Sequence, residues 1–170
     1  MSAVPYTLPI HRPPWPRWPY AVVLGILFFG PLAAPLFQAT MLPLVADTGA
    51  LARDLLSYYI CPTPAKSYIL LGFPMGVCAR CWGATIGLLV AWPLATRTAW
   101  LASYLALPWY ARLGVSSLPF WLWVIEIVRF PAAPLWLLLI NGVLAGIAAG
   151  LFFCSVWPGF LAAQKAHSSL

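Results

Sequence analysis

The strongest constraint on the fold is the stretch from Ala132 to Trp157, which contains no charged residue. It is long enough to cross a bilayer, since a spanning helix takes about 20 residues. A second apolar run extends from Tyr20 to Ala46. Charged residues make up only 7% of the whole chain, whereas soluble domains have about 25%. We therefore predict an integral membrane protein.

The apolar segments predict an all-α fold with about four transmembrane helices in one helical domain, residues 20–160. The expected helices occupy residues 20–46, 78–95, 117–128 and 132–157. The third helix has the weakest pattern, because Arg112 and Gly114 interrupt the apolar sequence before it. The segment from Ala99 to Ala111 could belong to a broken third passage or lie at the membrane interface.

Prolines shape the first helix and the connection to the second. Pro31, Pro35 and Pro43 predict kinks, which membrane helices tolerate when nearby groups satisfy the freed carbonyls. Gln38 and Thr40 are close enough in sequence to supply such hydrogen bonds.

A short interfacial helix is expected over residues 47–59. Asp47–Thr48 resembles a helix N-cap in front of it. Three prolines between Cys61 and Gly76 then predict a loop or re-entrant hairpin that leads into the second transmembrane helix.

The first 19 residues are rich in proline and tryptophan, which favours an extended strap rather than a helix. This strap would anchor at the membrane interface or lie along a partner protein. Residues 161–170 form a short polar tail. The positive charges of the chain, net +6, are scattered singly, which excludes a nucleic-acid partner and suits contact with anionic lipids. Four spans would place both termini on one side, for which we favour the cytoplasm.

Three of the four cysteines, Cys61, Cys78 and Cys81, flank the expected hairpin. The Cys-x-x-Cys spacing serves metal binding, disulfides and thiol exchange alike. The only histidines, His11 and His167, lie in the tails, so a fourth metal ligand is missing and we do not expect a bound metal ion. Cys61 would form a disulfide with Cys78 or Cys81 in an oxidising compartment. In the cytoplasm the three thiols would pack as small apolar groups.

Small residues predict where helices approach each other closely. Gly83 and Gly87 lie four positions apart in the second helix, and the last helix carries Gly142, Gly146 and Gly150 with the same spacing. Such stripes let two backbones pack tightly inside a membrane. We therefore interpret these five glycines as helix-packing positions.

One ion pair is expected within the membrane region. Glu126 and Arg129 are three positions apart and would share one helix face. Ionisable groups at membrane depth are costly unless they are paired or face the protein interior. We interpret this pair as structural rather than as a site with a functional carboxylate.

Residues 77–83, VCARCWG, together with Gly87, resemble the signature of the small bacterial membrane proteins called domain of unknown function 2085. That family reads P-V-C-A-R-C-T-G-I-Y-x-G, preceded by C-H-Q. Cys61 takes the place of the first cysteine, and Asn141–Gly142 with Gly146 resembles a later T-G-x-x-x-G. The resemblance implies a multi-pass protein of the bacterial cytoplasmic membrane, without a known reaction.

Two departures from this family pattern remove polar residues. Pro62–Thr63 replaces the His-Gln that follows the first cysteine. Residues 122–126 fall where the family has a polar D-G-x-x-Q stretch, and only Glu126 is ionisable there. If the family has a metal or catalytic role, the residues best suited to it are mostly absent from this chain.

We expect a non-catalytic accessory or structural subunit of a larger membrane complex, in a respiratory or photosynthetic electron-transfer chain. The sequence shows no paired carboxylates, catalytic triad, phosphate loop or complete metal set, and it is rich in packing residues. The expected partners are other membrane subunits and lipids, and the ten tryptophans suit contacts with lipid, quinone or pigment. The alternative is a small metal- or thiol-dependent membrane enzyme or assembly factor centred on Cys61, Cys78 and Cys81.

Overall fold

The computed structural model describes residues 16, 18–61, 63–97 and 100–156 and is mainly helical. Most of the predicted strap, the end of the predicted helical domain and the polar tail lie outside the described residues. The helices are α1 (Trp18–Ala39), α2 (Pro43–Tyr59), α3 (Ala79–Arg97), α4 (Trp100–Ala106), α5 (Trp109–Arg129) and α6 (Leu135–Val156). A short 3-10 turn, η1 (Pro64–Lys66), and a two-stranded hairpin of β1 (Ile69–Leu70) and β2 (Phe73–Pro74) connect α2 to α3.

The helices confirm the predicted all-α membrane fold. Within the described part of the chain, α1, α5 and α6 are long and apolar enough to cross a membrane. The apolar part of α3, Ala79–Ala95, is shorter. The structure thus has three long candidate spans and one shorter apolar helix where the sequence predicted about four spans.

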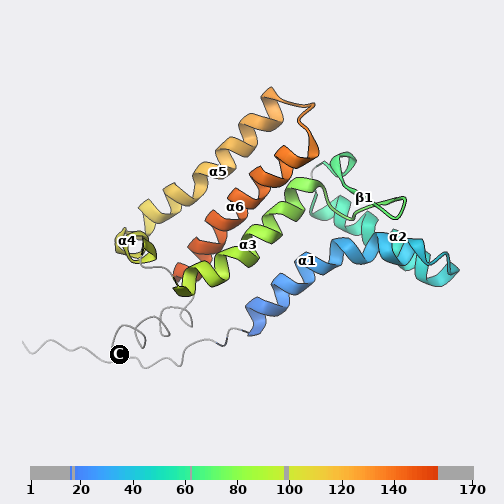
Figure 1. Ribbon diagram of the computed structural model, residues 1–170, viewed down its shortest axis with the longest axis horizontal. Helices are drawn as coiled ribbons and strands as arrows, with labels where there is room; N and C mark the ends of the chain where they lie inside the picture. The colour runs from blue at the N-terminus through green and yellow to red at the C-terminus, as the bar shows by residue number, and fades with distance from the viewer. Residues whose placement is uncertain (1–15, 17, 62, 98–99, 157–170) are drawn as a thin grey trace, which may run out of the picture.

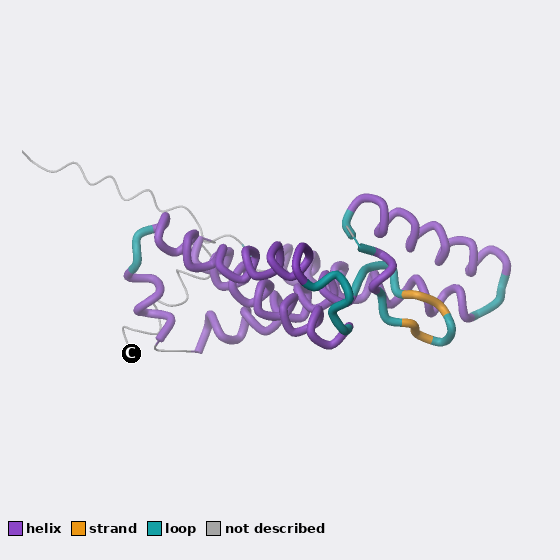
Figure 2. The backbone as a smooth tube through the Cα atoms, turned by 90° about the horizontal axis from the view of Figure 1, so that it is seen from above, coloured by secondary structure: helices purple, strands orange, loops and turns teal. Residues whose placement is uncertain are grey.

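The four apolar helices lie side by side in the order α5, α6, α3 and α1 (Figure 1). The most extensive contact is between α3 and α6, and smaller contacts join α5 to α6 and α1 to α3. The start of α1, the end of α3, α4 and the end of α6 lie at one end of this row. The β hairpin lies at the opposite end, beside α2 (Figure 2).

The prediction of one helix over residues 20–46 is wrong, because the chain breaks between α1 and α2. Met41 has a φ of 56°, a left-handed conformation that cannot continue a helix. Pro43 then opens α2, where its missing N–H costs nothing. The predicted cap is also wrong, since Leu42 occupies the N-cap position and Asp47–Thr48 lies inside the helix.

The carbonyl that Pro35 leaves free in α1 is satisfied by the hairpin segment rather than by the residues we predicted. Pro35 has no N–H to donate to the carbonyl of Pro31 in the preceding turn. The backbone N–H of Gly76 donates to this carbonyl instead, at 3.2 Å. The Thr40 hydroxyl donates within its own turn, and Gln38 Nε2 is buried without a hydrogen-bond partner.

The closest helix contact, between α3 and α6, follows the two glycine stripes. A Cβ atom at Gly142 would overlap the carbonyl oxygen of Arg80, and one at Gly146 would overlap that of Ala84. Side chains at these positions would therefore force the helices apart. The same close approach exists at Gly83, Gly87 and Gly150.

The region between residues 99 and 130 forms one short helix and one continuous helix. Arg112 and Gly114, which interrupt the apolar pattern, lie inside α5 without breaking it. The Arg112 side chain reaches the carbonyl of Ser155 on α6 at 3.5 Å. The hydroxyl of Tyr104 on α4 lies 2.9 Å from that of Ser116 on α5. The third passage is therefore longer than residues 117–128 and is preceded by a separate helix.

Candidate functional site

The β hairpin places Cys61 beside the start of α3. Its turn residues, Leu71 and Gly72, have φ values of 54° and 86°, as expected for a tight two-residue turn between antiparallel strands. The Lys66 ammonium donates to the carbonyl of Pro131 between α5 and α6, at 2.5 Å. The segment is thus attached to both α1 and the α5–α6 turn, which fixes the position of the cysteines at its two ends.

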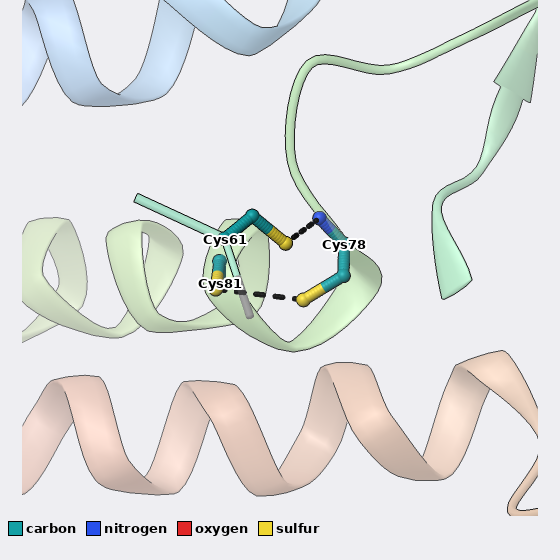
Figure 3. Close-up of side chains that lie close together, drawn as sticks. All are labelled: Cys61, Cys78 and Cys81. Atoms are coloured by element: carbon teal, nitrogen blue, oxygen red, sulfur yellow. Dashed lines mark hydrogen bonds between the residues drawn. The ribbon is translucent and has the colours of Figure 1, made fainter. Parts of the chain in front are cut away.

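The side chains of Cys61, Cys78 and Cys81 converge on one point (Figure 3). Their three Sγ atoms all lie within 4.8 Å of one another. The backbone N–H of Cys78 donates to Cys61 Sγ at 3.1 Å, and the Sγ atoms of Cys78 and Cys81 are 3.4 Å apart. All three are free thiols. Cys61 and Cys78 are buried, whereas Cys81 is partly exposed.

The surroundings of the cluster combine apolar side chains with a helix N-terminus that favours negative charge. Leu56, Val77 and Trp82 pack against the cysteines. Cys78 immediately precedes α3, where the positive end of the helix dipole favours a thiolate. The pKa of the Cys78 thiol is lowered, first by its hydrogen bond with Cys61 and then by that with Cys81. The same hydrogen bond between Cys61 and Cys78 raises the pKa of the Cys61 thiol.

A buried polar network lies one residue away from the cluster. Arg80 is only 1% exposed, and its Nη2 donates to Glu126 Oε1 at 2.6 Å. Asn141 Nδ2 donates to the other carboxylate oxygen at 2.5 Å. The guanidinium carbon of Arg80 also lies 5.6 Å from the centre of the Trp123 ring. This network joins α3, α5 and α6.

The predicted ion pair of Glu126 with Arg129 is replaced by the pair of Glu126 with Arg80. Arg129 is exposed at the end of α5. If Glu126 faced Arg129, the Arg80 charge would be buried without a counterion, which is strongly unfavourable. Glu126 is the only acid beyond Asp54 and thus the only carboxylate there for a buried arginine, but the sequence did not distinguish Arg80 from Arg129 as its partner.

The two groups differ in what they can do chemically. Both oxygens of Glu126 are occupied by hydrogen-bond donors, so the carboxylate is suited to holding helices together rather than to accepting a proton from a substrate. The three thiols can bind a soft metal ion or take part in thiol–disulfide exchange. The reactive groups of the site are therefore the cysteines.

A groove of about 310 Å³ opens between α5 and α6. Six apolar side chains of the two helices and of the turn between them line it, together with Glu126 and Asn141. Glu126 and Asn141 of the polar network therefore border a mainly apolar groove.

Comparison with protein families places these groups within one matched segment. Residues 61–152 match the family described as predicted membrane protein, DUF2085. The match starts at Cys61 and contains Cys78, Arg80, Cys81 and Glu126, as well as the glycine stripes of α3 and α6. Neither a curated protein nor a solved structure matches the chain.

Proposed function

This chain belongs to DUF2085, a family of predicted membrane proteins, and we propose that it is a non-catalytic accessory subunit of a larger complex in the bacterial cytoplasmic membrane. The complex we propose is part of a respiratory or photosynthetic electron-transfer chain. The observation that carries this proposal is the open row of helices, whose broad faces the described residues leave largely uncovered (Figure 1).

The burial of each span supports this interpretation. Of the most apolar part of α5, 11% is buried inside the structure, compared with 22% for α1 and 39% for α6. Helices in a closed bundle bury a continuous stripe against two neighbours, whereas α1 and α5 form the edges of the row (Figure 1). In the described part of the chain, α2 covers only part of α1, so the remaining outer surface of both helices is available to helices of other subunits as well as to lipid.

Exposed aromatic side chains on three helices of the row support the choice of complex. Trp109 and Trp121 on α5 and Trp136 on α6 are all at least 60% exposed, and so is Phe29 on α1. Aromatic residues are enriched at protein interfaces, and their flat rings also stack on conjugated molecules. Subunits next to quinones or pigments would present such a surface.

Native gel electrophoresis after gentle detergent extraction, followed by mass spectrometry, tests the proposal. We expect the chain to migrate in a fixed ratio with the subunits of a respiratory or photosynthetic complex. Migration alone, near its own mass of 18.6 kDa, would contradict the proposal.

Two sets of substitutions sharpen the test. Trp121→Ala on α5 and Phe29→Ala on α1 sample exposed positions on the two edge helices of the row, and loss of co-migration in one of them identifies the edge helix that contacts the complex. A Cys78→Ser, Cys81→Ser variant tests the non-catalytic role. If this variant still assembles but the complex loses an activity, the chain is not merely structural.

A further inference from the structure

The three thiols of the candidate site come from two segments that are 17 positions apart in the sequence. Sulfur atoms that bind one zinc ion at about 2.3 Å in tetrahedral geometry are themselves about 3.8 Å apart. The Sγ atoms of Cys61, Cys78 and Cys81 all lie within 4.8 Å of one another. A single ion between them therefore requires only small rotations of the side chains.

A disulfide would account for this arrangement less well. Any disulfide uses two sulfurs and leaves the third thiol in the cluster without a partner. The Sγ atoms of Cys78 and Cys81 are 3.4 Å apart, whereas the sulfurs of a disulfide are about 2.05 Å apart. A metal ion is the partner that uses all three cysteines at once.

The groups around the cluster are arranged for thiolates. The N–H of Cys78 already points at Cys61 Sγ, and the N-terminus of α3 contributes its positive dipole end. The indole N–H of Trp82, which packs on the cluster, is buried without an acceptor at hydrogen-bond distance. Such donors behind metal-bound sulfur are typical of metal sites.

We propose that Cys61, Cys78 and Cys81 bind one thiophilic metal ion with a filled d shell, either Cu⁺ or Zn²⁺, as three thiolates. Soft thiolate ligands select these ions over Mg²⁺ or Ca²⁺. No fourth cysteine, histidine or carboxylate joins the cluster in the described part of the chain. Cu⁺ would be bound by the three sulfurs alone, and Zn²⁺ would take a fourth ligand from solution.

Binding would replace the thiol protons by the ion and release them to water. The ion would also connect the segment after α2 to the start of α3, next to Arg80. The site departs from our expectation of no bound metal, which rested on the missing fourth ligand. It is independent of the proposed function, because an accessory subunit can assemble with or without it.

The test uses the full chain, purified in detergent with its thiols reduced and its metals removed by a chelator. Zn²⁺ and, under anaerobic conditions, Cu⁺ are titrated in separate experiments against competing chelators of known affinity. We expect one ion per chain, and metal analysis of chain isolated without chelator distinguishes Cu⁺ from Zn²⁺. Co²⁺ serves as a spectroscopic probe, since thiolate ligation gives intense charge-transfer absorption. Failure of reduced wild-type chain to bind either ion would overturn the proposal.

Single substitutions of the three cysteines by serine should each weaken binding about 100-fold or more, because even changes behind the ligands cost about 10- to 100-fold. Cys154→Ser is the matched control, since Cys154 is buried in a different cluster, with Ala91 and Leu151, and it should leave affinity unchanged. Equal affinity in a variant lacking all three cysteines would refute the site.

Alkylation in native membranes gives a readout that does not depend on the folding of variants. In the wild-type chain, Cys61, Cys78 and Cys81 should react slowly with a thiol reagent, and a membrane-permeant chelator should speed the reaction. If rapid thiol trapping finds Cys78 and Cys81 joined in a disulfide, or if the chelator has no effect, the proposal is wrong.

Discussion

At the scale of single residues, Glu126 on α5 is the residue that connects three helices. Its carboxylate accepts hydrogen bonds from Arg80 on α3 and Asn141 on α6. The Nε and Nη1 atoms of Arg80 are buried without hydrogen-bond partners, so Glu126 provides the counterion for an arginine whose charge is otherwise poorly solvated. The stability of this end of the row therefore depends on the carboxylate charge.

Glu126→Gln should lower the free energy of unfolding by about 3–5 kcal/mol, because it leaves the Arg80 charge buried without a counterion. Unfolding of the chain in mixed detergent micelles measures the change. Asp54→Asn is the control, since the pair of Asp54 with Arg53 is exposed and such pairs contribute about 0–1 kcal/mol. Arg80→Met combined with Glu126→Leu should recover much of the loss. Equal effects of Glu126→Gln and Asp54→Asn would show that the network is not structurally important.

At the scale of elements, α3 and α6 make the most extensive helix contact of the molecule, and glycines allow their backbones to approach closely. A Cβ atom at Gly146 would overlap a backbone carbonyl, which cannot move aside as a flexible side chain can. Gly114 in α5 lies in the same kind of helix, but an added Cβ there meets no atom within 4 Å. The two positions therefore separate the effect of packing from that of helix propensity.

Gly146→Ala should destabilise the chain by about 1–3 kcal/mol, as expected for an overpacked contact. Gly114→Ala should leave stability unchanged or raise it by up to about 1 kcal/mol, because alanine is the better helix former. Thermal unfolding of both variants in the same detergent measures the difference. Equal stability of the two variants would contradict the close contact between α3 and α6.

The proline pair in α1 leads to a second prediction for elements. Pro35→Ala introduces an N–H that competes with Gly76 for the carbonyl of Pro31. The amide of Gly76 should then exchange its hydrogen several-fold faster, because it loses one hydrogen bond of about 1 kcal/mol. Pro19→Ala, in the first turn of α1, is the control. The first four N–H groups of an α-helix have no acceptor within the helix, so an N–H added at position 19 competes with no other donor. Hydrogen exchange with mass spectrometry provides the measurement, and unchanged exchange at Gly76 in Pro35→Ala would exclude this coupling.

The sequence predicted the elements that depend on local pattern and missed those that depend on distant contacts. The long apolar runs were sufficient to predict α3, α6 and the beginning of α1, but not the end of α1. The break at Met41 was missed, because the apolar pattern continues through it and only the backbone conformation shows the turn. The spacing of Cys78 and Cys81 marked the candidate site. Glu126 was paired with a sequence neighbour, because its true partner lies 46 positions away.

At the scale of the whole molecule, apolar helices that follow one another in the chain run in opposite directions, so that α3 and α6, which are neighbours in the row, run in the same direction (Figure 1). The β hairpin and the α5–α6 turn lie at one end, and the connection between α4 and α5 lies at the other. The cysteine cluster and the Arg80–Glu126 network share the hairpin end. If the row crosses a membrane, both candidate groups lie near the same membrane surface.

Cysteines introduced at exposed positions test this arrangement. Leu71→Cys in the hairpin and Ala132→Cys in the α5–α6 turn should react with a membrane-impermeant maleimide from the same side, and Leu107→Cys, between α4 and α5, from the opposite side. Because we expect the termini in the cytoplasm, the Leu107 position should react from the cytoplasmic face. The cysteine cluster would then lie near the opposite, oxidising face, where the proposed metal ion would have to protect the thiols from forming the disulfide considered for that compartment. The wild-type chain gives the background labelling of its own cysteines. Reaction of the Leu71 and Ala132 positions from opposite sides would mean that the helices do not all cross the membrane, and the shared location of the two candidate groups would then no longer follow.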